Sequence, residues 1–470
     1  MARTISSYFF RGVLMNLKIS KFFKKLSSLG NKIDELSNII CYGKIISING
    51  FVIQASGLKN SSIGSECFIE RIIEESKRYY IIAEIIGFSG KITFLLPYEE
   101  INGILPGAYV FLKPGNKKNY LVKKIPLSTQ LLGRVLDSRG EPLDQLPKID
   151  YKYYTQIIAR NSINPLHRVP ITKVLDTGIR AINGLLTIGK GQKIGIFSNS
   201  GIGKSVLLGM MAKYTKADVI IIALIGERGR EVKDFIENIL DANSLSRSVI
   251  IAAPADVSPV LKIQSVSYAV NVAEYFFRHN KDVLLIMDSL TRYAMAEREI
   301  SLSLGELPVS KGYSASLFSK IPNIIERTGI VNNTKGSITS FYTILTEGED
   351  EQDPVAYLAR AALDGHIVLS RHYSDSGHYP AIDIESSISR IMPNIINSKQ
   401  YYQASYFKKL VSVYQKNRDL INIGAYVHGT DSLVDQAITM WPKLEKYLKQ
   451  KMSEQCDYNS SCQDLNKIFL

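Results

Sequence analysis

The chain contains few cysteines and lacks an apolar run long enough to span a bilayer. Its 470 residues include four cysteines, Cys41, Cys67, Cys456 and Cys462, none of them in CxxC spacing. This pattern argues against a structural zinc site or a disulfide framework and indicates reduced thiols. Basic residues interrupt the apolar residues near the N-terminus, so the layout of a signal peptide is missing as well. We therefore expect a cytoplasmic protein.

Basic residues outnumber acidic ones. The chain has 57 Lys and Arg and 44 Asp and Glu, which gives a net charge of +13. Such a balance fits nucleic acid, an anionic membrane surface or acidic partners. Lys, Ile and Asn are frequent along the whole chain, so the charge by itself does not select among these classes.

Residues 1–36 are predicted to form an N-terminal amphipathic helical segment. Apolar residues recur there at spacings of three and four, whereas lysines occupy much of the other face. The apolar residues are Ile19, Phe22, Phe23, Leu26, Leu29, Ile33 and Leu36, and the lysines are Lys18, Lys21, Lys24 and Lys25. Two interpretations stay open: a helix docked on its own domain, or a basic helix that binds a partner or a membrane surface.

The remaining sequence predicts three further domains. Residues 37–130 contain about six short β-rich runs, with Asn49-Gly50 as a hairpin turn, and indicate a small closed β-barrel. No interleaved basic and aromatic residues mark it as a nucleic-acid platform. Residues 131–394 alternate continuous apolar strands with helices, typical of an α/β domain with a mostly parallel sheet. Residues 395–470 are helical, with a polar tail from 453 expected to be loose.

A phosphate-binding loop follows the apolar run "KIGIF". The segment "SNSGIGKS" has the spacing of GxxxxGK[ST], with serine at its first position. Backbone N–H groups and the next helix N-terminus would hold phosphates, the Lys204 amine would reach the β and γ phosphates, and the Ser205 hydroxyl would bind Mg²⁺. The predicted nucleotide-binding residues are Ser198, Asn199, Ser200, Gly201, Ile202, Gly203, Lys204, Ser205 and Val206.

Acidic residues and arginines follow other strands at the same edge of the sheet, where ligands of α/β folds bind. "DVIIIALIG" is followed by Glu227, either a base that orients the attacking water or a helix-starting acid paired with a nearby arginine. "DVLLIMD" ends in Asp288, a candidate Mg²⁺ carboxylate, with Arg292 four residues later. The residues alone do not rank the carboxylates of the acidic loop 347–353, and they leave Arg390 as a surface arginine.

The sequence resembles a known family over residues 40 to 450. The segments that carry the resemblance are "GLLTIGKGQKIGIF", "IGERGREVKDFIENIL", "VIIAAPADVSP", "LLIMDSLTRYAMAEREISLSLGE", "FYTILTEGEDEQDP", "DGHIVLSR" and "GHYPAIDIESSISR". They are similar to the flagellum-specific ATPases, a branch of the type III secretion ATPases related to the rotary ATP synthase α and β subunits.

The resemblance implies a RecA-like ATPase domain, a homohexamer and ATP bound between subunits with Mg²⁺. It implies that Glu227 is the catalytic glutamate, with Arg228 beside it, and that Arg292 belongs to the site. Arg390 would be an arginine finger for the neighbouring subunit, and the Tyr379 ring would pack on adenine.

The family's role implies several partners. A regulatory stator-like protein would bind the N-terminal helix, and export chaperones and substrates would meet the C-terminal domain. The protein would associate peripherally with the inner membrane, at the membrane-embedded export gate. No specific nucleic acid is expected.

Three alternatives are weighed against the flagellar one. An injectisome ATPase would use the same residues. A transcription-termination RNA helicase would need exposed aromatic and basic residues on the barrel. A non-catalytic rotary-type scaffold should lack Glu227. Three departures from the family pattern, Ser198 for alanine, Asn199 for glycine and Asn183 for aspartate, leave the class intact. We expect Asn199 to tolerate left-handed backbone there, at the cost of some nucleotide affinity.

Overall fold

The computed structural model describes residues 42–58, 61–74, 77–112, 124–156, 164–332, 334–346 and 353–470. The predicted N-terminal helix and almost all of the acidic loop lie outside these residues. The chain divides into two compact units, residues 1–123 and 124–470, which are considered separately.

The first unit is a closed six-stranded antiparallel barrel in the order β1-β2-β5-β4-β3-β6, as the sequence predicted. Its strands are β1 (Tyr42–Asn49), β2 (Val52–Ser56), β3 (Glu66–Glu74), β4 (Lys77–Ser89), β5 (Ile92–Pro97) and β6 (Tyr109–Leu112). The predicted hairpin is confirmed, because Asn49 pairs with Val52 and Gly50 has a φ of 57°. Alternate side chains, such as Ile53, Ile69 and Ile81, fill the interior.

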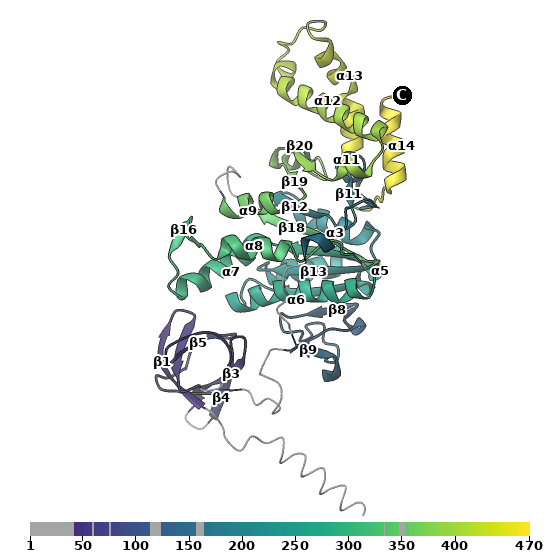
Figure 1. The fold of residues 1–470 in the computed structure, drawn as a ribbon. Helices are drawn as coiled ribbons and strands as arrows, with labels where there is room; N and C mark the ends of the chain where they lie inside the picture. Colours follow the sequence, from purple (N-terminus) through teal and green to yellow (C-terminus); the bar gives the residue numbers. More distant parts are fainter. Residues whose placement is uncertain are drawn as a thin grey trace, which may run out of the picture. The chain divides into compact units, whose positions relative to one another are not determined.

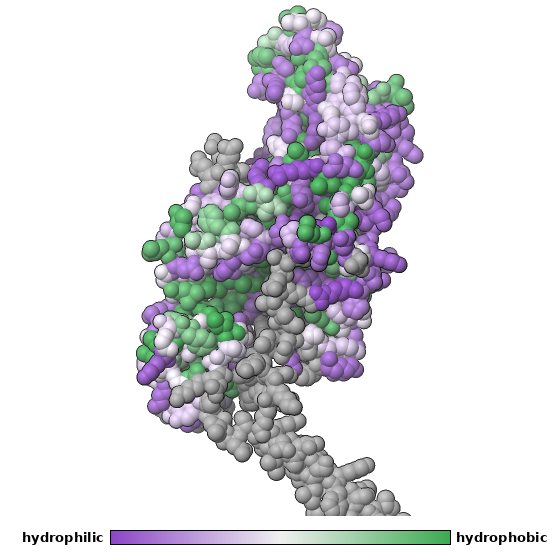
Figure 2. Space-filling model, in the orientation of Figure 1, coloured by the Kyte–Doolittle hydropathy of each residue, from purple (hydrophilic) through white to green (hydrophobic). Residues whose placement is uncertain are grey.

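The outer face of the barrel has a feature that the sequence did not reveal. Tyr42, Tyr80 and Tyr109 are 53%, 50% and 36% exposed, so this barrel does carry exposed aromatic residues. Hydrophobic residues are also visible at the surface of this unit in Figure 2. The sequence prediction missed them because the aromatic residues lie on different strands and only the barrel brings them together.

The second unit is built on an eight-stranded sheet in the order β20-β19-β12-β18-β15-β13-β14-β8. All neighbours pair in parallel except β19 and β20. The strands are β8 (Arg134–Leu136), β12 (Lys193–Ser198), β13 (Val219–Ile225), β14 (Ser248–Ala253), β15 (Asp282–Asp288), β18 (Ser337–Leu345), β19 (Gly365–Leu369) and β20 (Ile382–Ser389). The continuous apolar runs "KIGIF", "DVIIIALIG" and "DVLLIMD" are therefore confirmed as buried parallel strands.

Helices cover both faces of this sheet (Figure 1). One core packs α6 (Pro259–Arg278), α7 (Leu290–Ser303), α8 (Leu317–Ile325) and α9 (Pro354–Ala362) against it. The other core contains α2 (Arg180–Leu185), α3 (Lys204–Tyr214) and α4 (Gly229–Asp234). Short strands pair at the periphery: β7 (Lys124–Pro126) with β9 (Tyr154–Gln156), β10 (Val174–Leu175) with β11 (Ile188–Gly189), and β16 (Pro308–Ser310) with β17 (Tyr313–Ser314).

The C-terminal region is helical, as expected, but its tail is not loose. The helices are α12 (Ser398–Asn422), α13 (Ser432–Leu448) and α14 (Tyr458–Ile468). Asp457 caps α14, and the Leu465 side chain is fully buried in the core that also holds α2. The expectation failed because Ser461 and Leu465, four residues apart, give this otherwise polar helix one buried face. Within the described residues no helix combines the length and the apolar character that crossing a membrane requires.

Candidate functional site

The phosphate-loop segment connects the buried strand β12 to helix α3. Gly203, the residue before α3, has a φ of 87°, which a glycine adopts without strain. A Cβ at Gly203 would lie 3.2 Å from the ring of Tyr379, so the ring packs directly against the loop. The backbone N–H groups at the start of α3 have no helical acceptors and can bind an anion.

Three strand ends meet at the Lys204 amine. Its Nζ lies 3.2 Å from Glu227 Oε1, after β13, and 2.5 Å from Asp288 Oδ1, at the end of β15. The Asp288 carboxylate also accepts a hydrogen bond from the Thr343 hydroxyl of β18 at 2.7 Å. The predicted lysine and two predicted acids therefore lie in direct contact, although they come from positions 84 residues apart at most.

Burial and charge act together on this cluster. Burial lowers the pKa of Lys204, but the carboxylates of Asp288 and Glu227 outweigh it, so the pKa is raised and the amine stays protonated. Burial raises the pKa of Asp288, with a further increase from Glu227 and a partial offset from Lys204. The lysine thus contacts both carboxylates and offsets one of their two negative charges in a place with little solvent.

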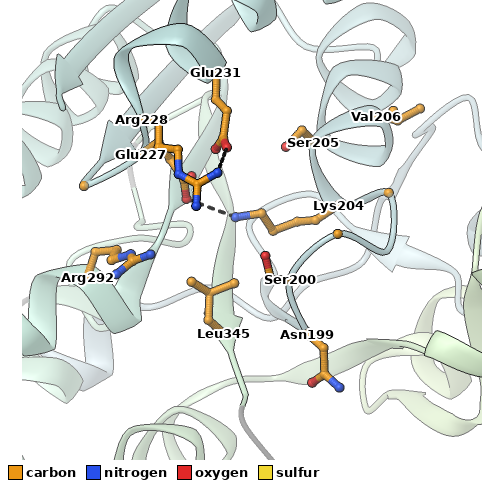
Figure 3. Close-up of a pocket in the computed structure, with 13 residues that line it drawn as sticks. Asn199, Ser200, Lys204, Ser205, Val206, Glu227, Arg228, Glu231, Arg292 and Leu345 are labelled. Carbon is orange, nitrogen blue, oxygen red and sulfur yellow. Dashed lines mark hydrogen bonds and ion pairs between the residues drawn. The ribbon is translucent and has the colours of Figure 1, made fainter. Parts of the chain in front are cut away.

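A cavity of about 380 Å³ opens beside this cluster (Figure 3). It is lined by Asn199, Ser200, Gly201, Gly203, Lys204, Ser205, Val206, Gly226, Glu227, Arg228, Glu231, Arg292 and Leu345. Of the predicted loop residues, Ser198 and Ile202 are absent from this lining because their side chains are buried in the protein. Asp288 contacts Lys204 but does not itself line the cavity.

Two arginines line the cavity and differ in their exposure and their partners. Arg228 is 84% exposed at its side chain and pairs with Glu231 at 3.5 Å. Arg292, on α7, has a buried Nε atom without a hydrogen-bond partner, which suits an anion that arrives with the ligand. Glu297, on the same helix as Arg292, contacts Lys320 and Tyr293.

Arg390 and Tyr379 do not line the cavity. Arg390 follows β20, is exposed, and donates a hydrogen bond to the main-chain oxygen of Arg360 at 3.5 Å. Tyr379 is 46% exposed and its hydroxyl lies 3.0 Å from the Ser374 hydroxyl. The Tyr379 ring is thus next to the phosphate loop, and the Arg390 guanidinium takes no part in this chain's own cavity.

The structure gives a different reason for the tolerance of Asn199 than the sequence did. Asn199 does not have a positive φ; the described non-glycine residues that do are Gln145, Asn280 and Lys311. Its side-chain oxygen instead accepts a hydrogen bond from the Thr346 hydroxyl at 3.1 Å. In Figure 3 the Asn199 side chain points away from Lys204.

Asn183 is also explained by its contacts. Its amide nitrogen donates to Asp176 Oδ1 at 2.9 Å and to the Cys456 carbonyl at 3.1 Å. Its oxygen accepts from the backbone N–H and the hydroxyl of Thr177 at 3.0 and 2.9 Å. An aspartate here would bring a second carboxylate against Asp176, so this chain requires the amide. The contact also fixes the C-terminal segment to α2.

Sequence reasoning missed Glu231, Gly226, Leu345 and Thr343. Glu231 lies in the first turn of α4, and its place in the segment "GERGREV" next to Glu227 was the available signal. Gly226 has a φ of 69°, and a Cβ there would lie 3.0 Å from Arg292, so glycine lets α7 approach the loop after β13. Thr343 reaches Asp288 from the neighbouring strand, a contact that only the strand order reveals.

The residues present fit a Mg²⁺ ion bound together with phosphates. Ser205 offers a hydroxyl oxygen in the cavity, and Asp288 offers a carboxylate that already faces a cation. Among the described residues no group of three or more His, Cys, Asp or Glu side chains forms a metal cage. Mg²⁺ typically takes one or two protein ligands and completes its shell with phosphates and water.

Family models match most of the second unit. Residues 178–389 match the nucleotide-binding domain of the ATP synthase alpha/beta family. Residues 396–467 match the C-terminal domain of the type III secretion ATPase EscN. The "Flagellum-specific ATP synthase" of Buchnera aphidicola subsp. Acyrthosiphon pisum is 71% identical over 470 residues, which cover 100% of both chains.

Solved structures agree with the fold. The assembled ATPase EscN of the enteropathogenic E. coli type III secretion system is 38% identical, with a TM-score of 0.83, over 91% of this chain and 100% of that one. EscN in complex with its central stalk EscO is 37% identical, with a TM-score of 0.80 and the same coverage. With the barrel, the phosphate loop and the Lys204 cluster in place, the chain belongs to the flagellum-specific ATP synthases and is an ATPase of the ATP synthase alpha/beta family.

Proposed function

We propose that the protein hydrolyses Mg²⁺-bound ATP to ADP and phosphate and so energises the export of flagellar proteins through a type III secretion apparatus. The observation that carries the proposal is the Lys204 amine held between Glu227 and Asp288 beside an open cavity. This arrangement keeps a cation and two carboxylates ready where the γ phosphate would lie.

Each residue has a distinct task in this proposal. The loop 198–206 binds the phosphates through its backbone, and the Lys204 amine turns from the carboxylates to the β and γ oxygens. Glu227, thereby released, orients the attacking water and takes its proton. Ser205 and Asp288 hold Mg²⁺, which, when bound, neutralises phosphate charge.

The arginines complete the site by stabilising charge that develops on the transferred group. Arg292 and Arg228 would serve the phosphates from within the chain, and Tyr379 would pack on adenine. Arg390, which does not line its own cavity, would act on the nucleotide of the next subunit in a homohexamer, where such a finger contributes roughly 10³ or more in rate. The assembled state of EscN supports this arrangement.

The partners follow from the same family role. We place a stator-like regulator at the N-terminal segment, chaperones and export substrates at α12–α14, and a stalk protein as in the EscN–EscO complex. The protein would work in the cytoplasm, peripherally at the inner-membrane export gate. The flagellar role is favoured over an injectisome role, because the flagellar relative is 71% identical and EscN 38%.

Specific ATPase activity, measured over a range of protein concentrations, tests the enzymatic part. Activity per milligram should rise as the chain assembles and should need Mg²⁺, whereas a Glu227→Gln chain, matched in size and fold, should stay inactive at every concentration. Equal activity in wild type and Glu227→Gln would contradict the proposal. Export of flagellar proteins in cells that lack their own export ATPase tests the biological part.

A further inference from the structure

The outer surface of the barrel carries one continuous apolar row across four strands. Strand register places Tyr42 opposite Phe111, Phe111 opposite Phe68, and Phe68 opposite Ile82, on β1, β6, β3 and β4. Directly opposed residues share a face of the sheet. The intervening residues of these strands are buried inside the barrel, so the row faces outward.

A second row next to it adds two exposed tyrosines. Tyr109 lies opposite Lys44, and Tyr80 lies opposite Glu70. Ring contacts join the rows, with centroids 5.3 Å apart for Tyr42 and Tyr109 and 6.1 Å apart for Tyr80 and Phe111. We call Tyr42, Phe68, Tyr80, Ile82, Tyr109 and Phe111 the aromatic face.

Two described cations beside the aromatic face already have partners. Arg78 pairs with Glu70 at 3.1 Å, and the Lys44 amine lies over the Tyr109 ring, 5.3 Å from its centroid. A single-stranded nucleic acid needs a groove of cations that follows its backbone in addition to stacking rings. The face therefore suits an apolar occupant better than a polynucleotide.

We propose that the aromatic face binds the chain's own residues 19–36 through their apolar stripe. The chain enters the barrel at Tyr42, which is itself a member of the face. Leu36 precedes Tyr42 by six residues, and six residues span at most about 20 Å. The end of the predicted helix therefore cannot leave the neighbourhood of this face. Eighteen helical residues extend about 27 Å, enough to cross four strands that lie about 4.8 Å apart.

The proposal accounts for both faces of the predicted helix. Phe22, Leu26, Leu29 and Ile33 would pack on the aromatic rings, and the lysines would stay in water. A partner that takes the same apolar stripe would then have to displace the segment from the barrel. This inference concerns the barrel unit and does not depend on the proposed ATPase mechanism.

Photo-crosslinking in the full-length chain tests the contact. A benzophenone side chain in place of Phe22 should crosslink to peptides of β4 and β6, and one in place of Lys24, on the opposite face of the predicted helix, should crosslink there at least fivefold less. Mixing chains of two isotopic labels separates crosslinks within one chain from crosslinks between copies. Crosslinks between copies would show that a second chain occupies the face and would overturn the proposal. Crosslinks to other regions alone would refute it as well.

A barrel variant and a competitor complete the test. Tyr80→Ser with Tyr109→Ser should lower the crosslink yield about fivefold and speed amide exchange of residues 19–36, whereas Tyr357→Ser, an exposed tyrosine of the other unit, should change neither. An oligouridine that lowers the crosslink yield, and that binds more weakly to the double variant, would instead assign the face to nucleic acid and overturn the proposal.

Discussion

Asn183→Asp should destabilise the second unit, because the amide at this position cannot be replaced by a carboxylate. The change removes two donated hydrogen bonds, one of them to the Asp176 carboxylate, and leaves the Cys456 carbonyl without this donor. A lost hydrogen bond to a charged group costs about 1.5–3 kcal/mol and one to a neutral group about 1 kcal/mol. We expect a loss of roughly 3–4 kcal/mol, with repulsion between the carboxylates softened by Lys216, 2.8 Å from Asp176.

The loss should depend on pH in a defined direction. Burial and the neighbouring Asp176 carboxylate raise the pKa of the carboxyl introduced at position 183 in the folded state above its unfolded value of about 3.9. The folded variant then binds more protons than the unfolded one, so its stability falls as pH rises through the raised pKa. The destabilisation relative to wild type should therefore be smaller at about pH 5 than at about pH 8.

Thermal unfolding, followed by fluorescence or calorimetry, measures both effects. With an unfolding entropy of about 2.1 cal/mol/K per residue, about 3–4 kcal/mol corresponds to roughly 5 °C in Tm for residues 124–470. The swapped pair, Asn183→Asp with Asp176→Asn, restores an amide donor and should recover part of the loss and most of the pH dependence. A single variant within about 1 °C of wild type at about pH 8 would refute the argument.

Three further outcomes follow from the described contacts. Lys204→Ala should weaken ATP binding at least about tenfold, measured by a fluorescent nucleotide, because the phosphates lose their principal cation; unchanged binding would contradict this. Asn199→Gly should change kcat by less than about threefold, since the Asn199 side chain points to Thr346 instead of the phosphates, and a large gain in activity would show that asparagine obstructs the loop. Leu465→Ala should lower stability by about 2–5 kcal/mol, seen in thermal unfolding, because it opens a cavity under α14; a loose tail would give no change.

Local sequence patterns were sufficient for the strands and for what stands at their ends. The continuous apolar runs that became β12, β13 and β15 placed Lys204, Glu227 and Asp288 at one edge, because the carboxyl ends of parallel strands meet there. Their mutual distances of 2.5 and 3.2 Å depend on strand order and backbone twist, which no local pattern contains.

Contacts between distant segments explain what the sequence did not predict. The tail was expected to be loose because its composition is polar. Leu465 is nevertheless buried in the core that also contains α2, which lies far earlier in the chain. No local pattern explained Asn183, which departs from the family pattern. Its hydrogen bonds to Asp176 and Cys456 supply the reason. The proposed role of Arg390 depends on a neighbouring subunit, which lies outside any local pattern of one chain.

Mixing two inactive variants tests most directly whether the active site is shared between subunits. Glu227→Gln chains keep Arg390, and Arg390→Ala chains keep Glu227, so a ring with both kinds contains interfaces with every intact residue. An equal mixture should regain activity at about one quarter of the wild-type sites if chains assemble at random, although each variant alone is nearly inactive. Activity equal to the mean of the two parents, in a mixture shown by native mass spectrometry to be co-assembled, would contradict the proposed role of Arg390 in the neighbouring site.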